Sequence, residues 1–244
     1  MNKFNIVVVG GGHSGVEAAA AAARMGCDVV LITHKKETIG QMSCNPAIGG
    51  IGKSHLTKEV DALGGLMARA ADLSGIHFRV LNSTKGQAVR ATRAQTDRQL
   101  YKKEIQQLLK HTKRLKIIEA SVEDLVVQKG KVKGVILKGG NKIKSERVIL
   151  ATGTFLGGVM HTGLQNKPGG RLGDPPSNKL AKRLKNLPFR VGRLKTGTPP
   201  RLDGRTINWK KLNKQPGDNP TPHMSYTFKE GQHPKQVNCH ITKT

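Results

Sequence analysis

Aromatic residues and cysteines are scarce in this sequence of 244 residues, and each shortage excludes a class of protein. Aromatic residues make up 3% of the chain, too few for base stacking on aromatic rings to dominate nucleic-acid binding. The three cysteines, Cys27, Cys44 and Cys239, stand at unrelated spacings. They form neither a disulfide framework nor a metal-binding pattern, and they indicate a reducing compartment.

Long apolar runs are also absent. No stretch approaches the length of a membrane-spanning helix, and no secretory signal precedes the first apolar segment. We therefore expect a cytoplasmic protein with no membrane-spanning segment. The chain is long enough to bury one large core or two modest ones.

Acidic residues are few as well: Asp and Glu total 16 against 42 Lys and Arg, which gives a net charge of +26. One interpretation is a polyanionic partner such as RNA, whose phosphates would meet these charges and release counterions. The other is a lysine-biased genome that spreads positive charge over every surface. Charge alone leaves both interpretations open.

Glycine, by contrast, is abundant, and its first cluster follows a mostly apolar segment at 4–8. Gly10, Gly12 and Gly15 form the pattern GxGxxG and lead into an alanine-rich, helix-favouring run at 16–25. A strand, a tight turn and a helix are the context of a dinucleotide-binding fingerprint. The glycines would form the turn, admit a pyrophosphate and let the helix pack on the strand, while free N–H groups face the phosphates. A plain glycine-rich turn without a ligand is the alternative.

The second predicted strand, 28–33, ends next to His34, where many dinucleotide sites place an acidic residue that binds the ribose. The nearest acid, Glu37, comes three positions later. This departure weakens the simplest interpretation, NAD at this site. FAD remains compatible, because other groups can hold its adenosine end.

Short strands are predicted in quick succession at 116–119, 121–128, 131–137 and 147–150. Their spacing indicates a β-meander inserted in a dinucleotide-binding domain. The last strand runs into Ala151-Thr152-Gly153, a small-residue turn that recurs as a second mark of two-dinucleotide flavoproteins.

Three further helices are predicted. One covers 55–67, one follows Asp97 as its cap with an apolar stripe from Tyr101 to Leu109, and one runs from 174 to 186. Beyond Asp203 the apolar residues thin out, so we expect residues 205–244 to pack loosely.

Two basic loops are candidates for phosphate contacts. One spans 85–98 and includes Arg90 and Arg93, and the other spans 190–201 and includes Arg193. A solvated basic connection is the alternative for each.

Several long strings of the sequence together resemble the GidA (MnmG) family. They are GGGHSG at 10–15, QMSCNPAIGGIGK at 41–53, EVDALGGLM at 59–67, KGQAVRATRA at 85–94 and GRLKTGTPPR at 192–201. The resemblance implies a FAD-dependent enzyme subunit that converts the wobble uridine of certain tRNAs to its 5-carboxymethylaminomethyl form. It also implies a folate-binding GTPase partner of the MnmE type, a homodimer, NADH as the reductant and methylenetetrahydrofolate as the carbon donor.

The resemblance also assigns site residues. It implies FAD contacts at Gly10, Gly11, Gly12, His13, Ser14, Gly15, Val122 and Ser177, and a chemical role for Cys44. C5 of uracil is a poor nucleophile until a group adds to C6, and a thiolate is suited to that addition. A glycine-rich loop near a flavin favours a reactive Cys44 over a buried, inert one.

The predicted fold class is therefore α/β, with a Rossmann-type FAD-binding domain and inserted β-meander at 1–155. The start of a second, substrate or NAD region would follow at 156–244. Because family members are much longer, we expect an N-terminal part whose fold is incomplete at its C-terminus. Two alternatives remain: a related folate- and FAD-dependent tRNA uridine methyltransferase, and a non-catalytic, basic RNA-binding remnant with a dinucleotide fold.

Overall fold

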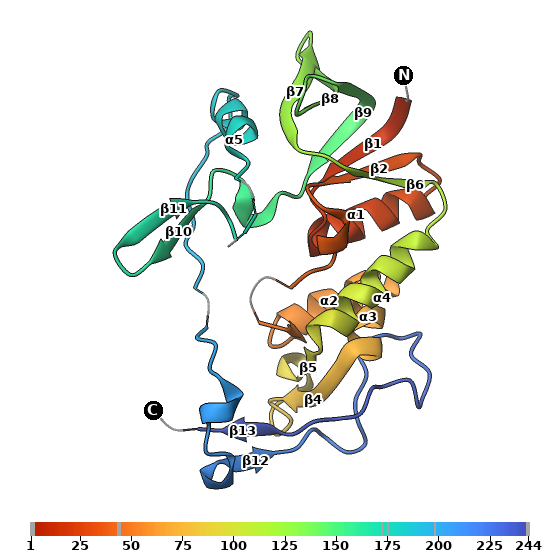
Figure 1. Ribbon diagram of the computed structural model, residues 1–244. Helices are drawn as coiled ribbons and strands as arrows, with labels where there is room; N and C mark the ends of the chain where they lie inside the picture. The colour runs from red at the N-terminus through yellow and green to blue at the C-terminus, as the bar shows by residue number, and fades with distance from the viewer. Residues whose placement is uncertain (1–2, 43–44, 172, 175, 198, 243–244) are drawn as a thin grey trace. The chain divides into compact units, whose positions relative to one another are not determined.

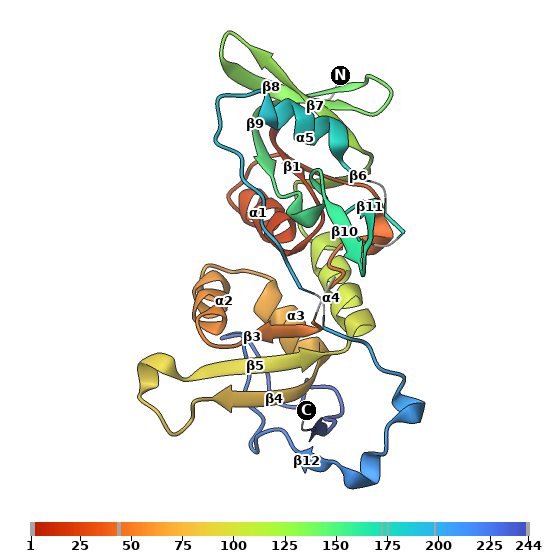
Figure 2. The ribbon, with the colours of Figure 1, turned by 90° about the vertical axis from the view of Figure 1, so that its left-hand side faces the viewer.

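The chain forms two compact units, each made of two separate stretches of sequence (Figures 1 and 2). Unit 1 contains Met1–Gly40 and Gln106–Lys195, and unit 2 contains Gln41–Ile105 and Thr196–Thr244. The computed structural model describes residues 3–42, 45–171, 173–174, 176–197 and 199–242. These units reflect contacts within this chain and divide it differently from the predicted domains. The domains 1–155 and 156–244 therefore stay a prediction.

A six-stranded sheet in the order β6-β2-β1-β9-β8-β7 forms the centre of unit 1. The four strands from β6 to β9 are mutually parallel, and β8 and β7 continue the sheet antiparallel. The strands are β1 (Lys3–Val9), β2 (Val29–Thr33), β6 (Leu115–Glu119), β7 (Val122–Gln128), β8 (Lys131–Leu137) and β9 (Lys142–Leu150). This arrangement confirms the predicted α/β class and the Rossmann-type parallel sheet.

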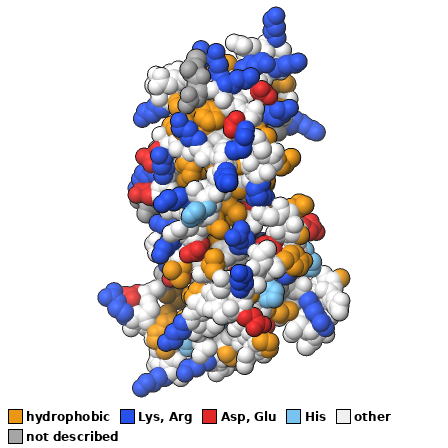
Figure 3. Space-filling view, turned by 90° about the vertical axis from the view of Figure 1, so that its right-hand side faces the viewer, with side chains coloured by type: hydrophobic (Ala, Val, Ile, Leu, Met, Phe, Trp, Pro, Cys, Tyr) orange, Lys and Arg blue, Asp and Glu red, His pale blue; other side chains and the backbone are white. Residues whose placement is uncertain are grey.

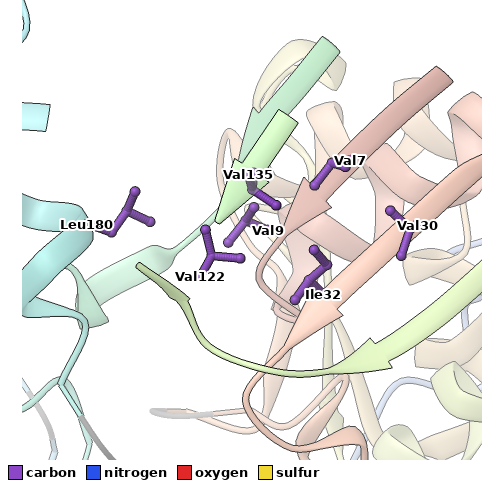
Figure 4. Packing of buried hydrophobic residues seen from close by; sticks show 7 residues of the cluster. All are labelled: Val7, Val9, Val30, Ile32, Val122, Val135 and Leu180. Atoms are coloured by element: carbon purple, nitrogen blue, oxygen red, sulfur yellow. The ribbon is translucent and has the colours of Figure 1, made fainter. Parts of the chain in front are cut away.

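Successive side chains of a strand point to opposite faces of the sheet, and in β1 and β2 both sets are apolar. Both faces of this sheet are therefore covered. Val8 and Leu31, both fully buried, belong to the face against which α1 (His13–Arg24) packs. On the other face, α5 (Asn178–Lys185) adds Leu180 to a cluster drawn from four strands (Figure 4). The cluster consists of Val7, Val9, Val30, Ile32, Val122, Val135 and Leu180.

Strand β6 departs from the sequence interpretation, which placed it in the inserted meander. It pairs parallel with β2, from Val29↔Leu115 to Thr33↔Glu119, and extends the Rossmann-type sheet. The meander consists of β7, β8 and β9, and β9 returns to pair with β1. Strand periodicity shows which residues share a face of a strand, and it carries little information on the partner strand.

The remaining elements of unit 1 are short. Two 3₁₀ turns, η1 (Lys36–Thr38) and η3 (Gly153–Phe155), follow β2 and β9. A two-stranded hairpin of β10 (Val159–Thr162) and β11 (Gln165–Pro168) precedes α5.

Unit 2 contains a small antiparallel sheet in the order β3-β5-β4. Its strands are β3 (Ala47–Gly49), β4 (Gly75–Leu81) and β5 (Ala91–Thr96), with a 3₁₀ turn η2 (Gln87–Val89). The helix predicted at 55–67 is wrong in extent: α2 covers Lys53–Ala62 and α3 covers Met67–Ser74. Gly64 lies between them with φ of +84°, a left-handed conformation that ends a helix and that glycine adopts most readily.

Helix α4 (Arg98–Lys110) begins as the sequence predicts. The Asp97 carboxylate accepts hydrogen bonds from the backbone N–H groups of Gln99 and Leu100, at 2.8 and 2.9 Å. Tyr101, Ile105 and Leu109 form its buried stripe.

The expectation that residues 205–244 pack loosely is wrong for the segment 224–226, which is anchored to α2 and α3. The buried Asp72 carboxylate accepts hydrogen bonds from the backbone N–H groups of Met224 and Ser225, both at 2.8 Å. Asp61 accepts from the Ser225 hydroxyl at 2.8 Å and from Tyr226 N–H at 2.7 Å. Two buried carboxylates, together with the fully buried Met224 side chain, thus hold this segment in place.

The rest of this stretch has little regular structure. It contains the 3₁₀ turns η4 (Gly204–Thr206) and η5 (Trp209–Lys211), and the paired strands β12 (Asn213–Gln215) and β13 (Cys239–Ile241). Among the described residues of the whole chain, no helix is both long and apolar enough to span a bilayer.

Candidate functional site

The turn between β1 and α1 is the candidate site, and its glycines have three different surroundings. Gly10 has φ of +113°, and a Cβ there would lie 2.2 Å from the Ala151 carbonyl oxygen. A Cβ at Gly15 would lie 1.8 Å from the Gly10 carbonyl oxygen. Both positions therefore require glycine for the fold itself.

Gly12 differs from these two because the space in front of it is open. Its φ is −77°, which any residue can adopt, and no described atom lies within 4 Å of the Cβ that would be added. The missing side chain therefore leaves room on the outer side of the turn. Such a cradle fits a pyrophosphate that approaches the backbone closely.

The turn lies at a switch point of the sheet. β1 lies between β2 and β9, so the loops after these neighbouring parallel strands meet at one edge. Gly10 N–H donates to the Ile32 carbonyl at 2.8 Å, and Ala151 N–H donates to the Val9 carbonyl at 2.8 Å. Ligands of open α/β sheets bind at such points, at the carboxyl ends of the strands.

The N-terminus of α1 suits an anion. Within the described residues, no side chain caps the helix and no acidic residue occupies its first turn. The first N–H groups of a helix and its dipole favour negative charge, so a phosphate is the matching ligand. His13 begins the helix, and burial lowers the pKa of its imidazole, which keeps it neutral at pH 7.

The structure brings Ser177 and the start of β7 to the end of β2. Nε2 of His34 lies 3.4 Å from the Ser177 hydroxyl and 3.4 Å from the hydroxyl of Ser121, the residue before Val122. Val122 itself is almost fully buried in the core cluster. Ser177, which the resemblance assigns, and Ser121, which it does not, are thus joined through His34.

His34 and Ser121 are residues that the sequence interpretation missed. His34 stands where an acidic residue usually does, and from the sequence it counts only as a departure from the fingerprint. The signal is the place of His34 at the end of its strand, where dinucleotide-binding folds usually carry the ribose-binding residue.

Cys44 lies outside the described residues, as does Ser43 before it. Its chemical role stays a prediction. The chain that follows forms β3 and then α2, within unit 2.

The basic loops differ in how their side chains are used. The Arg193 guanidinium donates to the carbonyls of Leu156 and Gly157, so it braces the chain after η3. Arg90 donates to the Lys85 carbonyl from an exposed position. Lys and Arg side chains are spread over the face seen in Figure 3, with few Asp and Glu among them.

An open hollow of about 590 Å³ lies at the opposite end of the same sheet. Its lining includes Lys3, Asp28, Arg114 and Lys116, at the amino ends of β1, β2 and β6. Because parallel-sheet ligands bind at the carboxyl ends, the candidate site is defined by the turn and not by this hollow.

Comparisons with known proteins agree with the fold. The family model described as "Glucose inhibited division protein A" matches residues 5–244. Two crystal structures of Aquifex aeolicus GidA are 45% and 44% identical, with TM-scores of 0.92 and 0.93, each covering 98% of this chain. This chain spans only 40% and 41% of those two chains. A GidA-related protein from Thermus thermophilus, 23% identical over 77% of this chain and 69% of its own, shares the fold at a TM-score of 0.56.

Proposed function

Because this chain belongs to the glucose inhibited division protein A (GidA) family, we propose that unit 1 binds FAD at the turn before α1. The observation that carries the proposal is the open cradle at Gly12, next to an uncapped helix N-terminus. The pyrophosphate would contact the backbone of the turn, and the adenosine end would lie toward Val122 and Ser177. The proposed FAD-binding residues are Gly10, Gly11, Gly12, His13, Ser14, Gly15, Val122 and Ser177.

We further propose that the protein modifies tRNA, converting the wobble uridine to its 5-carboxymethylaminomethyl form in the cytoplasm. Bound FAD would supply the redox chemistry, with NADH as reductant and methylenetetrahydrofolate as carbon donor. Cys44 would add its thiolate to C6 of the uracil, and the electron pair of the C5=C6 bond would then make C5 nucleophilic. A homodimer and a folate-binding GTPase of the MnmE type complete the proposed assembly.

The direct test is a titration of the purified 244-residue chain with FAD, followed by flavin fluorescence and by the shift of the flavin absorption band. The proposal expects saturable binding. A chain that binds tRNA but no FAD would be the non-catalytic RNA-binding remnant. Mass spectrometry of the modified tRNA separates the remaining alternative, because the uridine methyltransferase relative would leave a methyl group at C5.

Replacing the proposed nucleophile tests the chemistry apart from cofactor binding. In a version of the protein as long as its relatives, Cys44→Ser is expected to keep FAD bound and to reduce tRNA modification to background, because a serine hydroxyl is a far weaker nucleophile at neutral pH. Cys27→Ser, at a half-buried free thiol in unit 1, is the matched control and should keep activity. Normal turnover by Cys44→Ser would show that this thiol is incidental.

The charge surplus leads to a salt-dependence prediction. The affinity for tRNA should fall steeply with salt, and charge reversal of Arg90, Lys195 and Arg201 should lower the log–log slope by about 2–3 if their side chains meet phosphates. These three positions are exposed, and Arg193 is left unchanged because it braces the chain. Reversal of the exposed Lys110 and Lys129 is the control. Equal effects at all five positions would favour a genome-wide lysine bias over a binding face.

A further inference from the structure

His34 occupies the position at the end of β2 where this kind of fold usually carries the ribose-binding acid. Its ring is half-buried and fixed on two sides. Nε2 lies 3.4 Å from both Ser121 Oγ and Ser177 Oγ, and the ring meets Phe155 edge-to-face at a centroid distance of 6.4 Å. The end of β2, the start of β7 and the N-terminus of α5 are therefore joined at one imidazole.

The second ring nitrogen is left for a ligand. Within the described part of the chain, Nδ1 of His34 has no hydrogen-bond partner. If Nε2 accepts from a serine hydroxyl, Nδ1 carries the proton and donates; if Nε2 donates, Nδ1 accepts. A hydroxyl group satisfies either tautomer, because it can both donate and accept.

Burial keeps this imidazole neutral. Burial lowers the pKa of His34, and the Asp174 carboxylate opposes that shift without reversing it. Asp174 is itself paired with Arg171, whose guanidinium lies over the Phe155 ring at 5.5 Å. A neutral ring beside a neutralised ion pair is suited to a neutral hydroxyl ligand.

We propose that His34 binds a ribose hydroxyl of the adenosine half of FAD through Nδ1, with Ser121 and Ser177 holding the ring in place. This inference rests on the proposed FAD function and specifies it further. In this arrangement the His34 imidazole takes the place of the usual carboxylate. A carboxylate accepts from two hydroxyls, whereas His34 offers a single nitrogen oriented by two serines. Ser121 is then a positioning residue, since it acts on the ligand through His34.

The test compares ADP with 2′-deoxy-ADP and 3′-deoxy-ADP as ligands of the 244-residue chain, by isothermal titration calorimetry. Wild-type protein is expected to bind ADP about 3–10-fold more tightly than at least one deoxy analogue, the value of one hydrogen bond. His34→Ala should weaken the binding of ADP by a similar factor, and the variant should bind all three ligands with equal affinity. Ser121→Ala should reduce the preference in part. His111→Ala, at an exposed histidine after α4, is the control and should keep it.

The outcomes separate the two levels of the proposal. If wild-type protein binds FAD and binds ADP and its two deoxy analogues equally well, the assignment of His34 is overturned and the FAD proposal stands. This outcome can be seen with the wild-type protein, without any variant. The assignment is likewise overturned if His34→Ala keeps the wild-type preference. If wild type binds neither FAD nor ADP, the proposed FAD function is overturned, and the role of His34 with it.

Discussion

Gly12→Val is expected to abolish FAD binding and to leave the chain folded. The backbone at Gly12 has φ of −77° and ψ of −177°, which a β-branched residue adopts without strain. Apart from the chain neighbours of Gly12, no described atom lies within 4 Å of the added Cβ, so we expect the valine to fit without displacing the protein. The valine would instead occupy the space proposed for the pyrophosphate. Losing two or more hydrogen bonds to charged phosphates should weaken FAD binding by about a hundredfold or more, measured by flavin fluorescence titration.

The matched control lies three residues further along the same motif. Gly15→Val would place Cβ 1.8 Å from the Gly10 carbonyl oxygen, so α1 could not remain packed on the turn. This variant should lose its cooperative thermal transition, whereas Gly12→Val should keep the wild-type far-UV circular dichroism and melting temperature. Retained flavin in a folded Gly12→Val protein would contradict the assignment of the site. Unfolding of that variant would contradict the open space at Gly12.

Asp72→Ala is expected to destabilise unit 2 by about 2–5 kcal/mol, because it leaves two buried N–H groups without an acceptor. Asp72 has 1% relative exposure, and its carboxylate accepts from the backbone N–H groups of Met224 and Ser225. Urea unfolding gives the global loss. Limited proteolysis should show earlier cleavage after Lys214 and Lys229, because the anchored segment would be released.

Two further variants sharpen this prediction. Asp72→Asn keeps one of the two acceptor oxygens, so its free energy of unfolding should lie between those of wild type and Asp72→Ala. Asp203→Ala removes an exposed carboxylate paired with Arg205, and should leave the urea midpoint unchanged. If Asp72→Ala and Asp203→Ala behave alike, the buried carboxylate does not anchor this segment.

The parts of the fold that the sequence predicts are those governed by local signals. The turn at Gly10, the cap at Asp97 and the stripe on α4 each follow from residues within a few positions of one another. The partner of β6 and the anchoring of 224–226 depend on residues far away in sequence. A lone Asp on a short helix, as at Asp61 or Asp72, looks like part of a solvated face until the partner segment is known.

The candidate site follows the same division. The glycine turn is predictable because its glycines are required by close backbone contacts. In the structure, a Cβ at Gly10 or at Gly15 would overlap a backbone carbonyl oxygen. The place of His34 at the end of its strand is a local signal, but its serine partners could not be predicted, because they come from positions 121 and 177. The three-dimensional arrangement is needed to show how the His34 ring is held.

The anchoring carboxylates also constrain the order in which the chain can fold during synthesis. Asp61 and Asp72 emerge from the ribosome long before Ser225, and at translation rates of about 5–20 residues per second the delay is roughly 8–30 s. β1 likewise waits for β9, its parallel partner, which begins at Lys142. Through this interval the carboxylates of Asp61 and Asp72, on α2 and α3, lack the hydrogen-bond donors that residues 224–226 supply in the folded protein. A nascent chain released before residue 226 would therefore present an unfinished unit 2 to chaperones and proteases.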